Sequence, residues 1–270
     1  MFTAGDSAVL RALQTPSGAA LLLCTVIAGC EAGSIQPDPA SVVPQLAELL
    51  EDHDSEVRRT AAISLGKIAR ADSAAILVEH LDDPDPSVRQ ISAWALGNLG
   101  EVALDTAGLA LASKLDDPSP AVKFAAARAL GLIGSTQAII ELLTERLRYS
   151  DVHTRQAAVQ ALAWLEAASA FPALSQALSD KDARVRQGAV SALGELADPR
   201  ALSSFQDLLL KDPDVGVRSE AAYRLGKLGD LTVLPALRSA AAHDRDPGVR
   251  RWASWALDQI TPGSDSDSRL

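Results

Sequence analysis

Apolar and polar positions follow one another along this chain in a pattern that returns about every 32 residues. A valine is followed eight residues later by a leucine, and in six of seven copies the residue midway between them is alanine. Spacings of four, four and then three residues place these side chains and a further Ile or Leu on one face of an α-helix. The copies begin at Val57, Val88, Val122, Thr154, Val185, Val217 and Val249.

A shorter apolar segment precedes each of these helices. In six copies a leucine stands seven residues before the valine position, where it predicts the end of a first helix of about three turns. Prolines such as Pro84 and Pro86 stop that helix and stiffen the following turn. One such hairpin cannot bury its apolar face alone, but a stack of them can. The pattern therefore predicts an all-α fold, an α-solenoid of about seven two-helix repeats over residues 41–261.

A basic residue follows the valine position in every copy, so stacking would align seven basic side chains. They are Arg58, Arg89, Lys123, Arg155, Arg186, Arg218 and Arg250. The row has two interpretations, an anion-binding stripe or a structural ladder of ion pairs to loop aspartates of the same or the adjacent repeat. An aspartate row with the same period favours the ladder.

Those aspartates stand three residues before the valine position, where Asp is also a good N-cap for the second helix. They are Asp54, Asp85, Asp151, Asp182, Asp214 and Asp246. A further row stands five residues before the valine position: Asp52, Asp83, Asp117, Asp180, Asp212 and Asp244. It suits either a weak cation or basic-partner edge or a solvated rim of caps and Asx-turns. The rim is favoured, since the glycine and spacing of an EF-hand loop are missing.

Composition narrows the classes of function. The chain is 47% hydrophobic but only 4% aromatic, which suits closely packed helices rather than a β-sandwich. A formal charge of −10 disfavours general nucleic-acid binding. The four histidines, at positions 53, 80, 153 and 243, fall mostly in or beside loops and are interpreted as surface residues. No catalytic residue, metal site or cofactor is predicted.

The repeated pattern D-x-x-V-R-x-x-A-x-x-x-L-G resembles short HEAT repeats of the phycobilisome-lyase type over about residues 40–261. This resemblance implies an α-solenoid, but the repeat class serves bilin lyases, scaffolds and inhibitors alike. Repeat four departs most, with Thr154 in place of Val and Ala163 in place of Gly. The HEAT-like deoxyhypusine hydroxylases hold two irons with His-Glu dipeptides, and this chain has none.

One face of the second helices is not required for packing and would point to the inner surface of a curved stack. The candidate partner-binding residues on or beside it are Arg59, Ile63, Trp94, Phe124, Arg128, Gln160, Trp164, Tyr223, Arg251, Trp252 and Trp255. Trp, Tyr and Arg are the usual anchors of protein interfaces. The alternative is that the rings lie flat over adjacent helices as extra packing. Both stay open for any single Trp, and the row as a whole favours binding.

The N-terminus carries an uncharged apolar run of eleven residues, 19–29, too short to span a bilayer but right for an export signal. Its end, Ile27-Ala28-Gly29-Cys30, resembles the lipobox of bacterial lipoproteins, which implies that Cys30 is lipidated. On this interpretation residues 1–29 are the signal, 30–40 the lipidated cysteine and linker, and 262–270 a disordered tail. The alternative is an N-terminal capping helix with an ordinary buried cysteine.

Together these features predict a monomeric, non-enzymatic scaffold of the bacterial cell envelope, facing the periplasm or exterior. It would bind a protein or peptide on its concave face, bind no nucleic acid and no cofactor, and touch the membrane through its lipid alone. Two alternatives remain: a cytoplasmic HEAT-like subunit that assists an enzyme in the manner of a bilin lyase, and a metal-dependent oxidoreductase.

Overall fold

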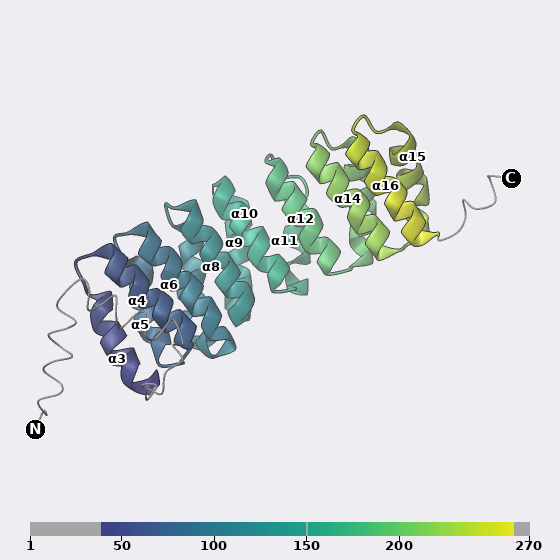
Figure 1. Cartoon of the computed structure of the whole chain (residues 1–270). Helices are drawn as coiled ribbons and strands as arrows, with labels where there is room; N and C mark the ends of the chain where they lie inside the picture. The colour runs from purple at the N-terminus through teal and green to yellow at the C-terminus, as the bar shows by residue number, and fades with distance from the viewer. Residues whose placement is uncertain (1–38, 150, 262–270) are drawn as a thin grey trace, which may run out of the picture. The chain divides into compact units, whose positions relative to one another are not determined.

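The computed structural model of the protein describes residues 39–149 and 151–261 (Figure 1). These residues form two compact units, which meet in the sequence between Gly134 and Ser135. All elements in the described part of the chain are helices, so the predicted all-α repeat fold is confirmed. The predicted export signal, the lipidated cysteine with most of its linker, and the predicted tail lie outside the described residues.

Unit 1 holds three helix pairs. They are α3 (Pro39–Leu50) with α4 (Ser55–Ile68), α5 (Ser73–Glu79) with α6 (Pro86–Leu99), and α7 (Leu104–Ser113) with α8 (Pro120–Ile133). Short 3-10 turns extend the first helices of the later pairs: η1 (His80–Asp82), η2 (Gly100–Ala103) and η3 (Lys114–Asp116). The second helices α4, α6 and α8 pack side by side (Figure 1).

Unit 2 holds four helix pairs of the same design. They are α9 (Gln137–Tyr149) with α10 (Val152–Trp164), α11 (Phe171–Ala177) with α12 (Ala183–Glu195), α13 (Leu202–Lys211) with α14 (Val215–Leu228), and α15 (Leu234–His243) with α16 (Pro247–Ile260). The 3-10 turns η4 (Ala168–Ala170), η5 (Pro199–Ala201) and η6 (Leu231–Val233) precede α11, α13 and α15. Helices α10, α12, α14 and α16 again pack on one another in sequence order (Figure 1).

The core consists of the repeated apolar positions. The repeat leucine has no exposed surface in the first six repeats: Leu65, Leu96, Leu130, Leu162, Leu193 and Leu225. Full burial of one such side chain stabilises the fold by about 1.5–3 kcal/mol. In the last repeat Leu257 is only half-buried. The repeat leucine is thus covered completely wherever a further repeat follows.

Six of the second helices begin at a capping aspartate, as the sequence predicts. The side chain of each aspartate three residues before the valine position accepts a backbone amide of the helix that follows; for example, Asp85 Oδ1 accepts from the Ser87 amide over 2.7 Å. Such a cap contributes about 1 kcal/mol. In repeat three, where Ser119 replaces the aspartate, the side chain makes no such bond.

Glycine after the repeat leucine lets successive second helices approach closely. A Cβ added to Gly66 would lie 2.8 Å from the Cα of Ala95, and one on Gly226 would lie 2.7 Å from the Cα of Ala256. Real Cβ atoms essentially never come this close to a neighbour's backbone. In α16 the same position is Asp258, whose side chain is exposed.

Candidate partner-binding surface

The predicted binding residues divide between the two units. Arg59 and Ile63 lie on α4, Trp94 on α6, and Phe124 and Arg128 on α8 of unit 1. In unit 2, α10 carries Gln160 and Trp164, α14 carries Tyr223, and α16 carries Arg251, Trp252 and Trp255. The two groups of side chains differ in how they pack.

In unit 1, the faces of α6 and α8 that carry Trp94 and Arg128, called the inner face below, border a half-open cavity of about 340 Å³. Its lining residues are Gln90, Ile91, Trp94, Ala121, Phe124, Ala125, Arg128, Ala129 and Leu132. The sequence picked out Trp94, Phe124 and Arg128 but missed Gln90, Ile91 and Leu132. Leu132 is 50% exposed and stands ten residues after its valine position, as Trp164 does, so applying that position to every repeat would have found it.

Trp94 both packs and lines the cavity. Its ring carbon Cζ3 would lie 2.9 Å from a Cβ added to Gly66, so the indole ring occupies the space that this glycine leaves open. The side chain is half-buried, and it also borders the cavity. The packing interpretation of Trp94 therefore holds for one side of the ring, while the other side borders the cavity.

Arg128 is the charged residue at the edge of this cavity. It is exposed, and within the described part of the chain its guanidinium makes no hydrogen bond or ion pair. Arg59 differs, since its Nε donates to Glu56 Oε2 over 3.1 Å on the same helix. An unpaired guanidinium beside apolar walls is free to bind a carboxylate of another molecule.

In unit 2 the predicted aromatic residues pack on one another. The Tyr223 and Trp255 rings are stacked with centroids 5.3 Å apart, and Trp252 meets them edge-on at 5.4 and 5.6 Å. Trp255 also lies over Gly226, whose added Cβ would be 3.0 Å from its ring. Rings at these separations are in contact and leave no room for a cation between them. Here the packing interpretation fits better, and Trp252 keeps 39% of its surface exposed.

The remaining candidates in unit 2 have exposed side chains. Gln160 and Trp164 are exposed on α10, and Trp164 is 45% exposed. Arg251 is exposed on α16 next to Trp252 in the chain. The nearby Arg224, which the sequence did not single out, is held by Glu195, Glu220 and Ser191.

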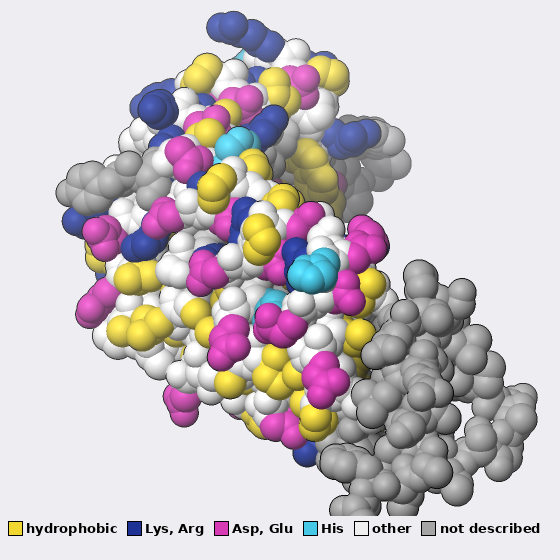
Figure 2. All heavy atoms as spheres, turned by 90° about the vertical axis from the view of Figure 1, so that its left-hand side faces the viewer, with side chains coloured by type: hydrophobic (Ala, Val, Ile, Leu, Met, Phe, Trp, Pro, Cys, Tyr) yellow, Lys and Arg dark blue, Asp and Glu magenta, His cyan; other side chains and the backbone are white. Residues whose placement is uncertain are grey.

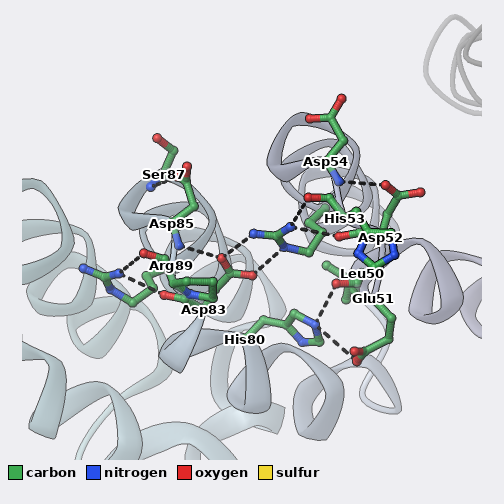
Figure 3. Close-up of polar contacts among 12 residues, drawn as sticks. Leu50, Glu51, Asp52, His53, Asp54, His80, Asp83, Asp85, Ser87 and Arg89 are labelled. Atoms are coloured by element: carbon green, nitrogen blue, oxygen red, sulfur yellow. Dashed lines mark hydrogen bonds and ion pairs between the residues drawn. The ribbon is translucent and has the colours of Figure 1, made fainter.

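The predicted ladder of ion pairs forms, but with a different row of aspartates. Arg58 Nε and Nη2 donate to the two carboxylate oxygens of Asp83 over 2.7 and 2.8 Å, and Nη1 donates to the Asp52 carbonyl (Figure 3). The same two-point contact joins Arg89 to Asp117. In unit 2 it joins Arg155 to Asp180, Arg186 to Asp212, and Arg218 to Asp244.

Each rung therefore joins a repeat to the next one through the aspartate five residues before the valine position. The aspartates at −3 that we assigned to the ladder (Asp54, Asp85, Asp151, Asp182, Asp214 and Asp246) are helix caps instead. The interpretation of the −5 row as a solvated rim of caps and Asx-turns is wrong about solvent exposure for Asp83, Asp117 and Asp212, which are buried, but it is right about the Asx-turns. Each of these also accepts a backbone amide two residues on, as Asp83 does from Asp85 over 2.8 Å, which fixes it towards the guanidinium.

The ladder shifts the acid–base properties of its members. Burial is the largest single influence on the pKa of Asp83 and of Asp117 and raises it, but the arginine hydrogen bond, the backbone amide hydrogen bond and the nearby positive charges together lower both pKa values below the ordinary value. The hydrogen bond to its aspartate raises the pKa of Arg58 and of Arg89. These arginines are held in pairs, which argues against an anion-binding stripe.

The ladder changes at two places. Arg250, in the last repeat, donates to the carbonyl oxygens of Asp244 and Arg245, and no carboxylate of the described residues bonds to it. In repeat three, Lys123 replaces the arginine and is buried. The sequence of repeat four has Tyr149 where the other repeats have the ladder aspartate.

The histidines do not form a site. His80 is buried, contrary to the sequence interpretation: its Nδ1 lies 2.9 Å from the Ile76 carbonyl oxygen and its Nε2 lies 3.1 Å from that of Leu50 (Figure 3). It thus links the end of α3 to the second helix pair. His53 and His243 are exposed and His153 is half-buried. Across residues 39–149 and 151–261, no three His, Cys, Asp or Glu side chains group as metal ligands.

None of the helices in the described part combines the length and the apolar character that a bilayer crossing requires.

Comparison with known families finds a match to the model for HEAT repeats. It aligns with residues 20–97, 108–182, 140–223 and 171–258. A search of curated proteins finds no significant sequence match.

Solved structures share the fold at low sequence identity. The complex of CpcE and CpcF of phycocyanin lyase from Nostoc sp. PCC7120 is 22% identical, with a TM-score of 0.50 over 86% of this chain and 98% of that one. The Escherichia coli protein YibA is 22% identical, with a TM-score of 0.59 over 94% and 92% of the two chains. An engineered protein is also 22% identical, with a TM-score of 0.53 over 93% and 77%.

Proposed function

Because the chain belongs to the HEAT-repeat family, we propose that it is a non-enzymatic scaffold that binds a protein or peptide through the inner face of unit 1. The observation that carries this proposal is the cavity between α6 and α8, with apolar walls and the unpaired Arg128 at its edge. Trp and Arg beside a preformed hollow are the residues that most often anchor protein interfaces.

Photo-crosslinking tests this proposal in cells. Benzoylphenylalanine replaces Leu132, which is 50% exposed at the cavity, and in a matched control it replaces Leu109, which is 59% exposed on α7. We expect a defined crosslinked protein from position 132 that is absent from position 109 and is lost when Arg128→Glu is added. Equal crosslinking from both positions, or none from position 132, would refute binding at this cavity.

The scaffold is further proposed to be anchored in a bacterial cell envelope by lipid on Cys30, facing the periplasm or exterior. The support is the sequence alone: the apolar run of residues 19–29 ends at Ile27-Ala28-Gly29-Cys30. Mass spectrometry of the mature N-terminus should find an acylated Cys30, and Cys30→Ala should release the protein from membranes. An uncleaved, unmodified N-terminus would refute the anchor.

A second candidate is a cytoplasmic subunit that assists an enzyme. The observation that favours it is the shared fold with the CpcE–CpcF complex of phycocyanin lyase over most of both chains. This candidate shares the binding of a protein partner but predicts a cytoplasmic location and an enzyme as the crosslinked partner. Cell fractionation together with the identity of the crosslinked protein separates the two.

A further inference from the structure

The inner face of unit 1 differs in charge from the rest of that unit. Residues 39–134 include 14 acidic and 8 basic side chains, and acidic groups are spread over the end that carries α3 and α4 (Figure 2). No acidic residue stands on the faces of α6 and α8 that carry Trp94 and Arg128. The corresponding face of α4 carries Glu56, which is paired with Arg59.

The cavity itself limits what enters it. Its volume of about 340 Å³ is at the small end of the range of ligand pockets, so it accommodates a side chain with its adjoining backbone rather than a whole structural element. Trp94, Phe124 and Leu132 give it apolar walls, while Gln90 adds an amide. An apolar side chain is the group that gains most from burial among these residues.

We propose that this cavity binds an extended acidic segment of a partner protein, in which an apolar side chain of leucine or phenylalanine size stands next to Asp or Glu. The proposal rests on the proposed function and specifies its ligand. The apolar side chain enters between Trp94 and Phe124, and the neighbouring carboxylate pairs with Arg128. A planar guanidinium can donate two parallel hydrogen bonds to that carboxylate.

The charge of the surroundings favours this class of segment. A basic segment would place its cations beside Arg128, the charged residue among those that line the cavity, while Glu56 on α4 is already paired with Arg59. A nucleic acid needs several free cations along its phosphates. The ladder arginines that would align in such a row are held by aspartates within each unit.

Three fluorescein-labelled peptides of eleven residues test the ligand class by fluorescence polarisation against the full chain. All have a Gly-Ser framework; one carries a central Leu flanked by Asp, the second Leu flanked by Lys, and the third Ala flanked by Asp. We expect the Leu–Asp peptide to bind at least tenfold more tightly than the other two. Trp94→Ala and Arg128→Glu should each weaken its binding about tenfold or more.

Arg238→Glu serves as the control, because Arg238 is an exposed arginine on α15 of unit 2 and is not among the candidate partner-binding residues. It should leave the affinity unchanged. With Arg128→Glu the preference should move towards the Leu–Lys peptide. Equal or tighter binding of the Leu–Lys peptide by the unchanged protein would overturn the acidic class while leaving peptide binding at the cavity intact. No measurable binding of the Leu–Asp peptide would also overturn it, and crosslinking from position 132 would then decide the proposed function separately.

Discussion

Units 1 and 2 both have a tryptophan at the same repeat position, but the surroundings of its ring differ. Trp94 and Trp255 both follow their valine position by six residues, and both rings lie over a glycine of the preceding second helix. Trp94 borders an open cavity, whereas Trp255 is stacked against Tyr223 and edge-on to Trp252. The neighbouring helix therefore decides whether a tryptophan at this position borders open space or is covered by other rings.

The two units are alike in the loops that join the two helices of each pair. Both use a guanidinium that joins one repeat to the aspartate of the next, and both use a capping aspartate two residues later. The same ion pairs and caps thus stabilise both units, and the units differ at a few positions of the second helices. The predictions below test this division, from the largest expected effect to the smallest.

Removing a ladder aspartate should destabilise either unit by a similar, large amount. In Asp117→Ala of unit 1 and Asp212→Ala of unit 2, a largely buried arginine loses its carboxylate, which costs about 3–5 kcal/mol. Asp52→Ala is the control, because Asp52 is exposed and its side chain accepts only the Asp54 amide; about 1 kcal/mol or less is expected. Urea unfolding followed by circular dichroism measures the midpoints. Similar midpoints for all three variants would contradict the ladder's role.

Truncation of an aromatic side chain should destabilise the protein more in unit 2 than in unit 1. Tyr223→Ala removes a ring that contacts both Trp252 and Trp255, so we expect a loss of about 2–4 kcal/mol. Phe124→Ala removes a half-buried ring that already borders a cavity, and its cost should be smaller, about 1–2 kcal/mol. Thermal melting of both variants checks the order, and the reverse order would mean that the open surface lies in unit 2.

Acid should weaken both units through the ladder. The pKa of Asp83, Asp117 and Asp244 is lowered in the folded protein: burial, the largest single influence, raises it, but the arginine hydrogen bond, the backbone amide hydrogen bond and the nearby positive charges together lower it by more. Such groups stabilise the fold above their ordinary pKa, and this contribution is lost as pH falls through the lower, folded value. Urea midpoints from pH 6 to pH 3 should fall, and the fall should be shallower in Asp83→Asn combined with Asp117→Asn. An identical slope in that variant would contradict this origin.

Neutralising an exposed arginine of the inner face should leave stability almost unchanged. Arg128→Gln in unit 1 and Arg251→Gln in unit 2 are each expected to change the free energy of unfolding by less than about 0.5 kcal/mol, since both side chains are exposed. Only Arg128→Gln should weaken binding of the Leu–Asp peptide. A clear loss of stability in Arg128→Gln would show that this guanidinium serves the fold.

The fold could be predicted from the sequence because it depends on short-range periodicity. Positions such as Val88 and Leu96 repeat at helical spacing, and a two-helix hairpin with that pattern has one way to bury them. The cap role of Asp85 followed from its place before the helix. The ladder partner did not, because Asp83 and Asp85 have the same period and only the three-dimensional stacking shows which of them faces Arg58.

The candidate partner-binding surface was predicted less completely, because the sequence does not show which side chains of the next repeat cover each ring. Helical geometry places Trp94 and Tyr223 on equivalent faces of their second helices, but it does not show what covers each ring. Tyr223 is covered by Trp255 from the following repeat, and Trp94 is left open because Phe124 and Leu132 border a hollow instead of filling it. His80 was misassigned because its contact to Leu50 spans thirty residues of sequence.

The glycines that follow the repeat leucines also constrain how a chain of this kind can lengthen by duplication. A repeat that ends in Leu-Gly, such as Leu225-Gly226, presents bare backbone on which another hairpin can dock. The last repeat ends in Leu257-Asp258, and its exposed carboxylate stands where the next helix would need to sit. A further hairpin could therefore dock on α16 as closely as α16 docks on α14 only if Asp258 were replaced by a small residue.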